Sequence, residues 1–172
     1  YNIRKFEFAG GCLGCFNCAG NGKCIYNDNF DNFLRGNIQS GDAIIYAFTI
    51  KDHSMGSLFK MFDDRQFCNG HRTVTQGSPV GYIINGDINK ENNLKTILQA
   101  RAEVGGNYLS GIAYDNETIK TTIEKLNYSL ENQYHTPRNF YGVGRMKIFR
   151  DLIWVRRGIM KADHEFYKRH GV

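Results

Sequence analysis

Two short runs of apolar residues constrain the fold of this chain most strongly. Residues 42–48 read Asp-Ala-Ile-Ile-Tyr-Ala-Phe, and residues 80–84 read Val-Gly-Tyr-Ile-Ile. Continuous apolar runs of this length are typical of strands buried on both faces of a parallel sheet. Each run is followed by a polar loop and then by an amphipathic segment, at 57–65 and 94–104. This alternation predicts βαβ units, and hence a parallel sheet with helices on both faces.

The remaining segments extend the pattern at both ends. We predict strands at residues 1–8 and 106–113, and helices at 29–39 and 116–130, with Asp28 capping the first of these helices. From residue 140 onward the alternation stops. Met146, Phe149, Leu152 and Ile153 suit a helix packed on one side, which Gly158 would end. The sequence therefore predicts one domain over residues 1–134 and a basic, aromatic helical extension over 135–172.

Composition narrows the classes of protein that this chain can belong to. The 41% apolar and 23% charged fractions are those of a folded globular chain. No run reaches the roughly 18 apolar residues that span a bilayer, so we expect no membrane partner. The positive charge gathers in residues 135–172, which suits a nucleic acid, a phosphorylated cofactor, an acidic partner or simply a solvated helix face. Because no nucleic-acid-binding module is recognisable, we expect no nucleic-acid partner.

Four of the five cysteines lie in one short run. Cys12, Cys15 and Cys18 are three residues apart, and Cys24 follows six positions later, with glycines between them that allow tight turns. This spacing favours an iron–sulfur cluster, because zinc sites more often use two separated cysteine pairs. Zinc, or thiols without metal, remain alternatives. Without a secretory signal, five cysteines also indicate a reducing, cytoplasmic location, and Cys68 reads as a free, partly buried thiol.

The chain resembles the NADPH-dependent FMN reductase family, and its compact cysteine run is similar to that of the iron-sulfur flavoproteins within it. The cysteine spacing is the most specific marker of the resemblance, which extends to about residue 113. Further matching segments are the buried strand at 42–48, the helix Lys60-Met-Phe-Asp-Asp-Arg65, and the segments 140–144 and 148–152. The resemblance implies a flavodoxin-like, three-layer α/β/α fold that binds FMN at the carboxyl ends of its strands.

The resemblance also implies the site residues. The loop that embraces the flavin ring corresponds to Thr49, Ile50, Lys51, Asp52, His53, Ser54, Met55 and Gly56, and a second flavin-side loop to Asn85, Gly86 and Asp87. His53 would hydrogen-bond a flavin edge or would be a solvated loop histidine. The ligands of a [4Fe-4S] cluster correspond to Cys12, Cys15, Cys18 and Cys24.

One departure from the family lies at the start of the chain. Family members open with a strand and a Ser/Thr-rich loop that holds the FMN phosphate at a helix N-terminus, whereas Tyr1 corresponds to the second strand. The missing strand belongs in the middle of the sheet. We therefore expect an exposed gap, which reflects a truncated chain or is filled by a second copy.

The function implied by the resemblance is an FMN-dependent oxidoreductase. It would carry electrons from NAD(P)H to an unknown acceptor through the flavin and the cluster, without a catalytic side chain of its own. A non-catalytic flavodoxin-like electron carrier or redox-sensing module is the alternative, and a structural remnant that binds neither cofactor is a third reading. The sheet gap and the aromatic tail also predict a homo-oligomer, a dimer or a tetramer.

Overall fold

The computed structural model describes residues 1–171. Contacts divide the chain into two units, each assembled from separate stretches of sequence. The sheet unit comprises Gly41–Gly56 and Thr75–Val143. The cysteine unit comprises Tyr1–Ser40, Ser57–Val74 and the chain from Gly144 onward. The predicted division at residue 134 stays a prediction.

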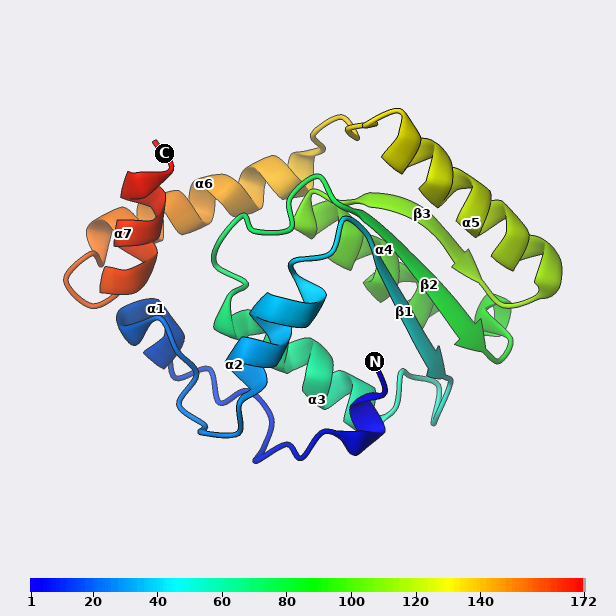
Figure 1. Cartoon of the computed structure of the whole chain (residues 1–172), viewed down its shortest axis with the longest axis horizontal. Helices are drawn as coiled ribbons and strands as arrows, with labels where there is room; N and C mark the ends of the chain where they lie inside the picture. Colours follow the sequence, from blue (N-terminus) through cyan, green and yellow to red (C-terminus); the bar gives the residue numbers. More distant parts are fainter. Residues whose placement is uncertain (172) are drawn as a thin grey trace. The chain divides into compact units, whose positions relative to one another are not determined.

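The sheet unit contains three parallel strands, β1 (Ile44–Thr49), β2 (Pro79–Asn85) and β3 (Tyr108–Ala113), in the order β1-β2-β3. The helices α4 (Asn92–Gly105) and α5 (Asn116–Glu131) lie on the two sides of the sheet (Figure 1). A short η4 turn (Ile88–Lys90) follows β2. Parallel strands covered by helices on both sides confirm the predicted α/β class and are consistent with a flavodoxin-like fold.

The central strand is buried because it has neighbours on every side. Val80, Tyr82 and Ile84 are each at most 5% exposed. Gly81 is pressed against α5, since a Cβ there would lie 2.8 Å from Ser110 Oγ and 3.2 Å from Thr122 Cγ2. This close approach is why a glycine interrupts the apolar run. The predicted burial on both faces is confirmed for β2.

Burial on both faces is wrong for β1, which is an edge strand. Its residues alternate between half-buried and exposed, and Ile45 is 40% exposed. The outer edge of β1 pairs with no strand within residues 1–171. The predicted gap left by a missing strand stays a prediction.

The cysteine unit is built from short helices and turns. In chain order these are η1 (Ile3–Lys5), α1 (Asn17–Asn21), α2 (Phe30–Phe33), η2 (Leu34–Ile38), α3 (Ser57–Arg65), η3 (Gln66–Cys68), α6 (Phe140–Val155, in this unit from Gly144) and α7 (Lys161–Arg169). The helices predicted at 29–39 and 57–65 are confirmed as α2 with η2 and as α3. Asp28 does accept a hydrogen bond from the amide of Phe30, although Asn29 is the capping residue.

The strand predicted at residues 1–8 is wrong. This segment contains the η1 turn, in which the Asn2 side chain accepts a hydrogen bond from the amide of Arg4. Its aromatic side chains pack on α2 instead of alternating across a sheet. The ring centroids of Phe6 and Phe33 are 5.2 Å apart, and those of Phe8 and Phe30 are 5.5 Å apart. Aromatic residues favour strands only when a pleated neighbour is present to pack against.

The last helix of the chain and the hydropathy of all the helices complete the description of the fold. The segment after Gly158, which lies in the helical extension predicted over 135–172, forms α7 and packs against α1. Within residues 1–171, none of the helices combines the length and the hydropathy that a bilayer crossing requires.

Candidate functional site

The cysteine run forms a tightly turned loop around α1. Gly14, Phe16 and Gly22 have positive φ angles of 63°, 58° and 76°, so the backbone reverses direction on each side of the short helix. Cys18 lies in α1, and the other three cysteines lie in the loops before and after it. Glycine favours such left-handed positions because it has no Cβ to clash. The sequence therefore bends the run so that its thiols face a common space.

All five cysteines line one cavity of about 330 Å³. Cys12 and Cys15 are exposed, Cys18 and Cys24 are half-buried, and Cys68 is buried. The rest of the lining is mostly apolar, and includes Leu13, Phe16, Ile25, Phe67 and Phe149. Within the described chain, no three His, Cys, Asp or Glu side chains are grouped closely enough to hold a metal ion as they stand. The structure thus gathers the predicted ligands around one space without fixing them in ligand geometry.

Arg65 closes the base of the cysteine loop. Its guanidinium donates to the Gly10 carbonyl at 2.8 Å and forms a two-pronged ion pair with Asp28, with both N–O distances 2.8 Å. Asp28 in turn accepts a hydrogen bond of 3.0 Å from the amide of Ala9. Residues on both sides of the cysteine run are therefore tied to one side chain of α3. A bidentate Arg–carboxylate pair is among the strongest side-chain contacts.

The Arg65–Asp28 pair is buried, with the two side chains 0% and 6% exposed. Arg65 also lies between the rings of Tyr26 and Phe30, each 4.7 Å from the guanidinium carbon. The hydrogen bonds from Arg65 lower the pKa of Asp28 from 3.8 to about 2. Gly10 lies directly against Tyr26, because a Cβ at Gly10 would lie 2.6 Å from the tyrosine oxygen. The loop base is thus closely packed as well as ion-paired.

Two polar side chains from the α2–η2 segment hold the far end of the loop. The amide of Cys24 donates to Asp31 Oδ2 at 2.5 Å. Arg35 donates to the Gly22 carbonyl at 2.7 Å, and the Asn17 side chain donates to the Lys23 carbonyl at 2.9 Å. These contacts fix the backbone that carries Cys24 but leave its sulfur free of them.

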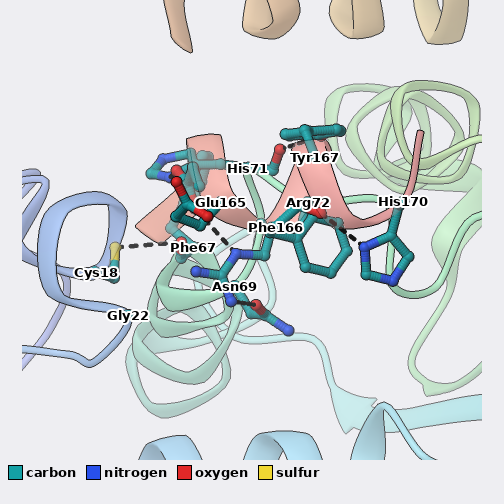
Figure 2. A network of polar contacts seen from close by, with 12 residues as sticks. Cys18, Gly22, Phe67, Asn69, His71, Arg72, Glu165, Phe166, Tyr167 and His170 are labelled. Carbon is teal, nitrogen blue, oxygen red and sulfur yellow. Dashed lines mark hydrogen bonds and ion pairs between the residues drawn. The ribbon is translucent and has the colours of Figure 1, made fainter. Parts of the chain in front are cut away.

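A network of polar contacts adjoins the cysteine cavity through His71 (Figure 2). His71 lines the cavity, and its Nδ1 lies 3.0 Å from Asp163 Oδ2. Arg72 Nε donates to the other oxygen of Asp163 at 3.0 Å, and the Tyr167 hydroxyl donates to the His71 carbonyl at 2.6 Å. The ring of Phe16 stacks on His71 with centroids 5.4 Å apart. The network joins the cysteine loop to α7.

Three charged or titratable residues of this region were not predicted from the sequence: His71, Asp163 and Arg65. Asp163 is 2% exposed and Arg65 is 1% exposed, whereas charged residues are rarely so buried unless they are paired. No spacing signal joins His71 to a carboxylate 92 positions later. The Asp-Arg pair that ends α3 was noted only as a family marker, and that marker contains Arg65.

The protonation of the thiols depends on their burial. Burial raises the pKa of Cys18 to about 11, and the nearby Asp163 carboxylate adds to the shift. Burial also raises the pKa of Cys68, with Asp31 contributing. Both thiols are therefore protonated at neutral pH. A metal that bound Cys18 would have to displace its proton, because the thiolate is the ligand form.

The two loops predicted to face a flavin meet at the carboxyl ends of β1 and β2. The amide of Ile50 donates to the Asn85 carbonyl at 3.0 Å. Gly86, with φ of 134°, lies against the Ile50 side chain, since a Cβ at Gly86 would be 3.0 Å from Ile50 Cδ1. His53 Nδ1 lies 3.0 Å from Glu91 Oε1, with the His53 side chain 89% exposed. This edge is where open α/β sheets bind ligands.

The other predicted flavin residues differ in accessibility. Lys51 and Ser54 pair through their backbones at 2.8 Å in both directions, which makes the loop a closed turn. Met55 is 3% exposed, so its side chain belongs to the core. The exposed members are Lys51, Asp52, His53, Ser54, Asn85, Gly86 and Asp87. The structure brings the two loops together, and their binding role stays a prediction.

Comparison with known proteins gives two similar chains. A protein named "Iron-sulfur flavoprotein" from Archaeoglobus fulgidus is 26% identical over 173 aligned positions, which cover 93% of this chain and 78% of that protein. A protein from Clostridioides difficile, also named as an iron-sulfur flavoprotein, is 35% identical over 54 positions, 31% of this chain and 24% of that protein. No family model matches the chain, and no solved structure matches it. The two similarities support a relationship of this chain to a family of flavoproteins.

Proposed function

We propose that this protein carries electrons through a flavin and an iron–sulfur cluster. The observation that carries the proposal is the single cavity lined by Cys12, Cys15, Cys18 and Cys24. The similarity to two proteins named as iron-sulfur flavoproteins supports it. In this proposal the four cysteines hold a [4Fe-4S] cluster, and the loops after β1 and β2 contact FMN. NAD(P)H is the electron donor, and an unidentified molecule is the acceptor.

The flavin would supply the exchange between hydride and single electrons, and the cluster would supply single-electron transfer. The chain's own residues would bind the two cofactors, orient them, and exclude water from them. The apolar lining limits the access of water to the half-buried Cys18 and Cys24, which strengthens electrostatic contacts around these two thiols, whereas Cys12 and Cys15 are exposed. Arg65 and Asp28 hold the loop base, and Asp31 holds the backbone at Cys24. No side chain is assigned as an acid or a base.

The cysteines bear on the cellular compartment that we propose, and the edge of the sheet bears on the oligomeric state. Free cysteines that are to hold iron require a reducing compartment, for which we propose the cytoplasm. The free edge of β1 is a surface that a further strand would cover, and a homo-oligomer is one way to supply that strand.

Purification without oxygen, followed by assays for flavin, iron and sulfide, tests the proposal. The expected result is one flavin and about four irons per chain, with absorption that is bleached on addition of NADPH or NADH. The Cys12→Ser, Cys15→Ser double variant is the matched comparison, since both thiols are exposed and their loss should not unfold the chain. Protein free of both flavin and iron would contradict the proposal.

An electron carrier without nicotinamide turnover is the second candidate. It is favoured by the exposure of every ionisable side chain in the two flavin-side loops, among them His53 at 89%. Rapid mixing with NADPH separates the two candidates. Flavin reduction much faster than turnover with an artificial acceptor supports the reductase. A flavin that dithionite reduces and that neither NADPH nor NADH reduces supports the carrier.

A further inference from the structure

A second cavity lies between α6 and α7, apart from the cysteines. It has a volume of about 610 Å³, and we call it the α6–α7 groove. Its lining residues are Arg150, Asp151, Ile153, Trp154, Arg157, His164, Tyr167 and Lys168. The base of the groove is apolar and firm, because Ile153 and Tyr167 are 3% and 7% exposed and pack in one cluster with Ala19 and Met160.

The rim of the groove is cationic. Asp151 is the lone carboxylate among the lining residues, and it is already paired with Arg150, whose two nitrogens lie 2.9 and 2.7 Å from the same oxygen. Arg157 and Lys168 form no ion pair within residues 1–171. Arg157 donates to the Trp154 carbonyl at 3.0 Å, and its guanidinium lies over the Trp154 ring at 5.2 Å. Two positive charges therefore face the groove without compensation.

Trp154 supplies a large aromatic surface beside these charges. The residue is 63% exposed although its helix packs firmly through the neighbouring Ile153. Its indole therefore offers an aromatic face at the groove, and tryptophan is enriched at binding surfaces because it joins a large apolar ring to one polar N–H. An indole with cations around it suits a ligand that combines a flat ring with negative charge.

We propose that the α6–α7 groove binds a phosphate-bearing nucleotide. Arg157 and Lys168 contact the phosphates, and the base lies against Trp154. The groove's volume is within the range of about 300–1,000 Å³ that small-molecule sites occupy. The nucleotide site uses none of the residues assigned to the flavin or the cluster, so it does not depend on the proposed function.

Tryptophan fluorescence measures binding at this groove directly, because Trp154 is the sole tryptophan of the chain. Titration of the purified 172-residue chain with ADP, followed by indole fluorescence, should give a saturable change. Adenosine lacks the phosphates, and should bind about tenfold or more weakly. Inorganic phosphate alone should leave the fluorescence unchanged. ADP is neither oxidised nor reduced, so the titration reads the same whether or not the electron-transfer proposal holds.

Variants test whether the binding belongs to the groove. Arg157→Gln and Lys168→Gln should each weaken ADP binding about tenfold by removing a charged contact to phosphate. Lys125→Gln on α5 removes the same charge at an exposed position outside the groove, and should bind ADP like the parent. All three positions are exposed, so unchanged thermal unfolding curves should accompany these results.

Several outcomes would overturn the proposal. One is the absence of any ADP-dependent fluorescence change, and another is equal binding of ADP and adenosine. If Lys125→Gln weakened ADP binding as much as the groove variants do, the loss of affinity would come from the overall charge of the protein and not from the groove. A fluorescence change that depends on protein concentration and not on ADP concentration would indicate that the groove is a contact between copies of the chain. Tight binding of an acidic protein or RNA, without binding of ADP, would indicate that the groove binds a macromolecule.

Discussion

The cysteine unit and the sheet unit hold their candidate loops in different ways. In the sheet unit, the loops after β1 and β2 are positioned by strand pairing, and the side-chain contact of His53 with Glu91 is at the surface. In the cysteine unit, buried ion pairs such as Arg65–Asp28 and Arg72–Asp163 position the loop and its surroundings. The first arrangement tolerates changes of side chain, whereas the second depends on a few charged residues.

The largest effect should come from breaking the buried pair. Arg65→Ala leaves Asp28 buried without its partner, and should lower the free energy of unfolding by about 3–5 kcal/mol. Lys60→Ala removes the surface partner of Asp64 from the same helix, α3, and should cost at most about 1 kcal/mol. Urea unfolding of both variants measures the difference. Equal costs would show that the buried pair does not hold the loop.

A steric test in the sheet unit should come next. A Cβ at Gly111 would lie 2.1 Å from Thr122 Oγ1, so Gly111→Ala forces β3 and α5 apart and should cost about 1–3 kcal/mol. Gly36 in η2 is the matched glycine, since a Cβ there meets nothing within 4 Å. Gly36→Ala should be neutral or stabilising, because alanine is the better helix former. Thermal unfolding checks both changes, and a neutral Gly111→Ala would contradict the packing described for α5.

Acid should weaken the cysteine unit through Asp28. Its pKa falls from 3.8 to about 2 on folding, so the stabilisation is complete above about pH 4 and disappears as the pH falls toward 2. The amount at stake is about 2 kcal/mol. Asp28→Asn should already lack this contribution at neutral pH and should lose less stability between pH 4 and 2. The pH dependence of urea midpoints tests this, and parallel curves for the two proteins would argue against it.

The smallest effect should come from the exposed loop contact. His53→Ala removes a pair in which the histidine is 89% exposed, and should change stability by less than about 1 kcal/mol. The same variant sharpens the flavin prediction. A clear loss of flavin affinity with unchanged unfolding would favour a contact between His53 and the flavin, and unchanged affinity would leave it a solvated loop histidine.

What could be predicted from the sequence depends on local periodicity and not on the division into units. Apolar runs and amphipathic spacing depend on local periodicity, and they predicted β2, α3, α4 and α5 closely. They failed at residues 1–8, where Phe6 and Phe8 pack on α2. They predicted the strand β1 but not its exposed residues, because its outer edge pairs with no strand among the described residues 1–171. The cysteine spacing identified the residues that share the cavity. Arg65 and His71 lie outside such reasoning, because their partners are distant in sequence.

The most direct test of the central claim compares two cysteines that line the same cavity. Iron and sulfide are assayed on oxygen-free preparations of the parent chain, Cys24→Ser and Cys68→Ser. We expect about four irons per chain in the parent, loss of iron in Cys24→Ser, and retention of iron in Cys68→Ser. The Cys24 amide that binds Asp31 is kept in the variant, so the loop backbone should remain held. Iron retained by Cys24→Ser, or no iron in the parent, would show that Cys24 is not a ligand of an iron–sulfur cluster in this cavity.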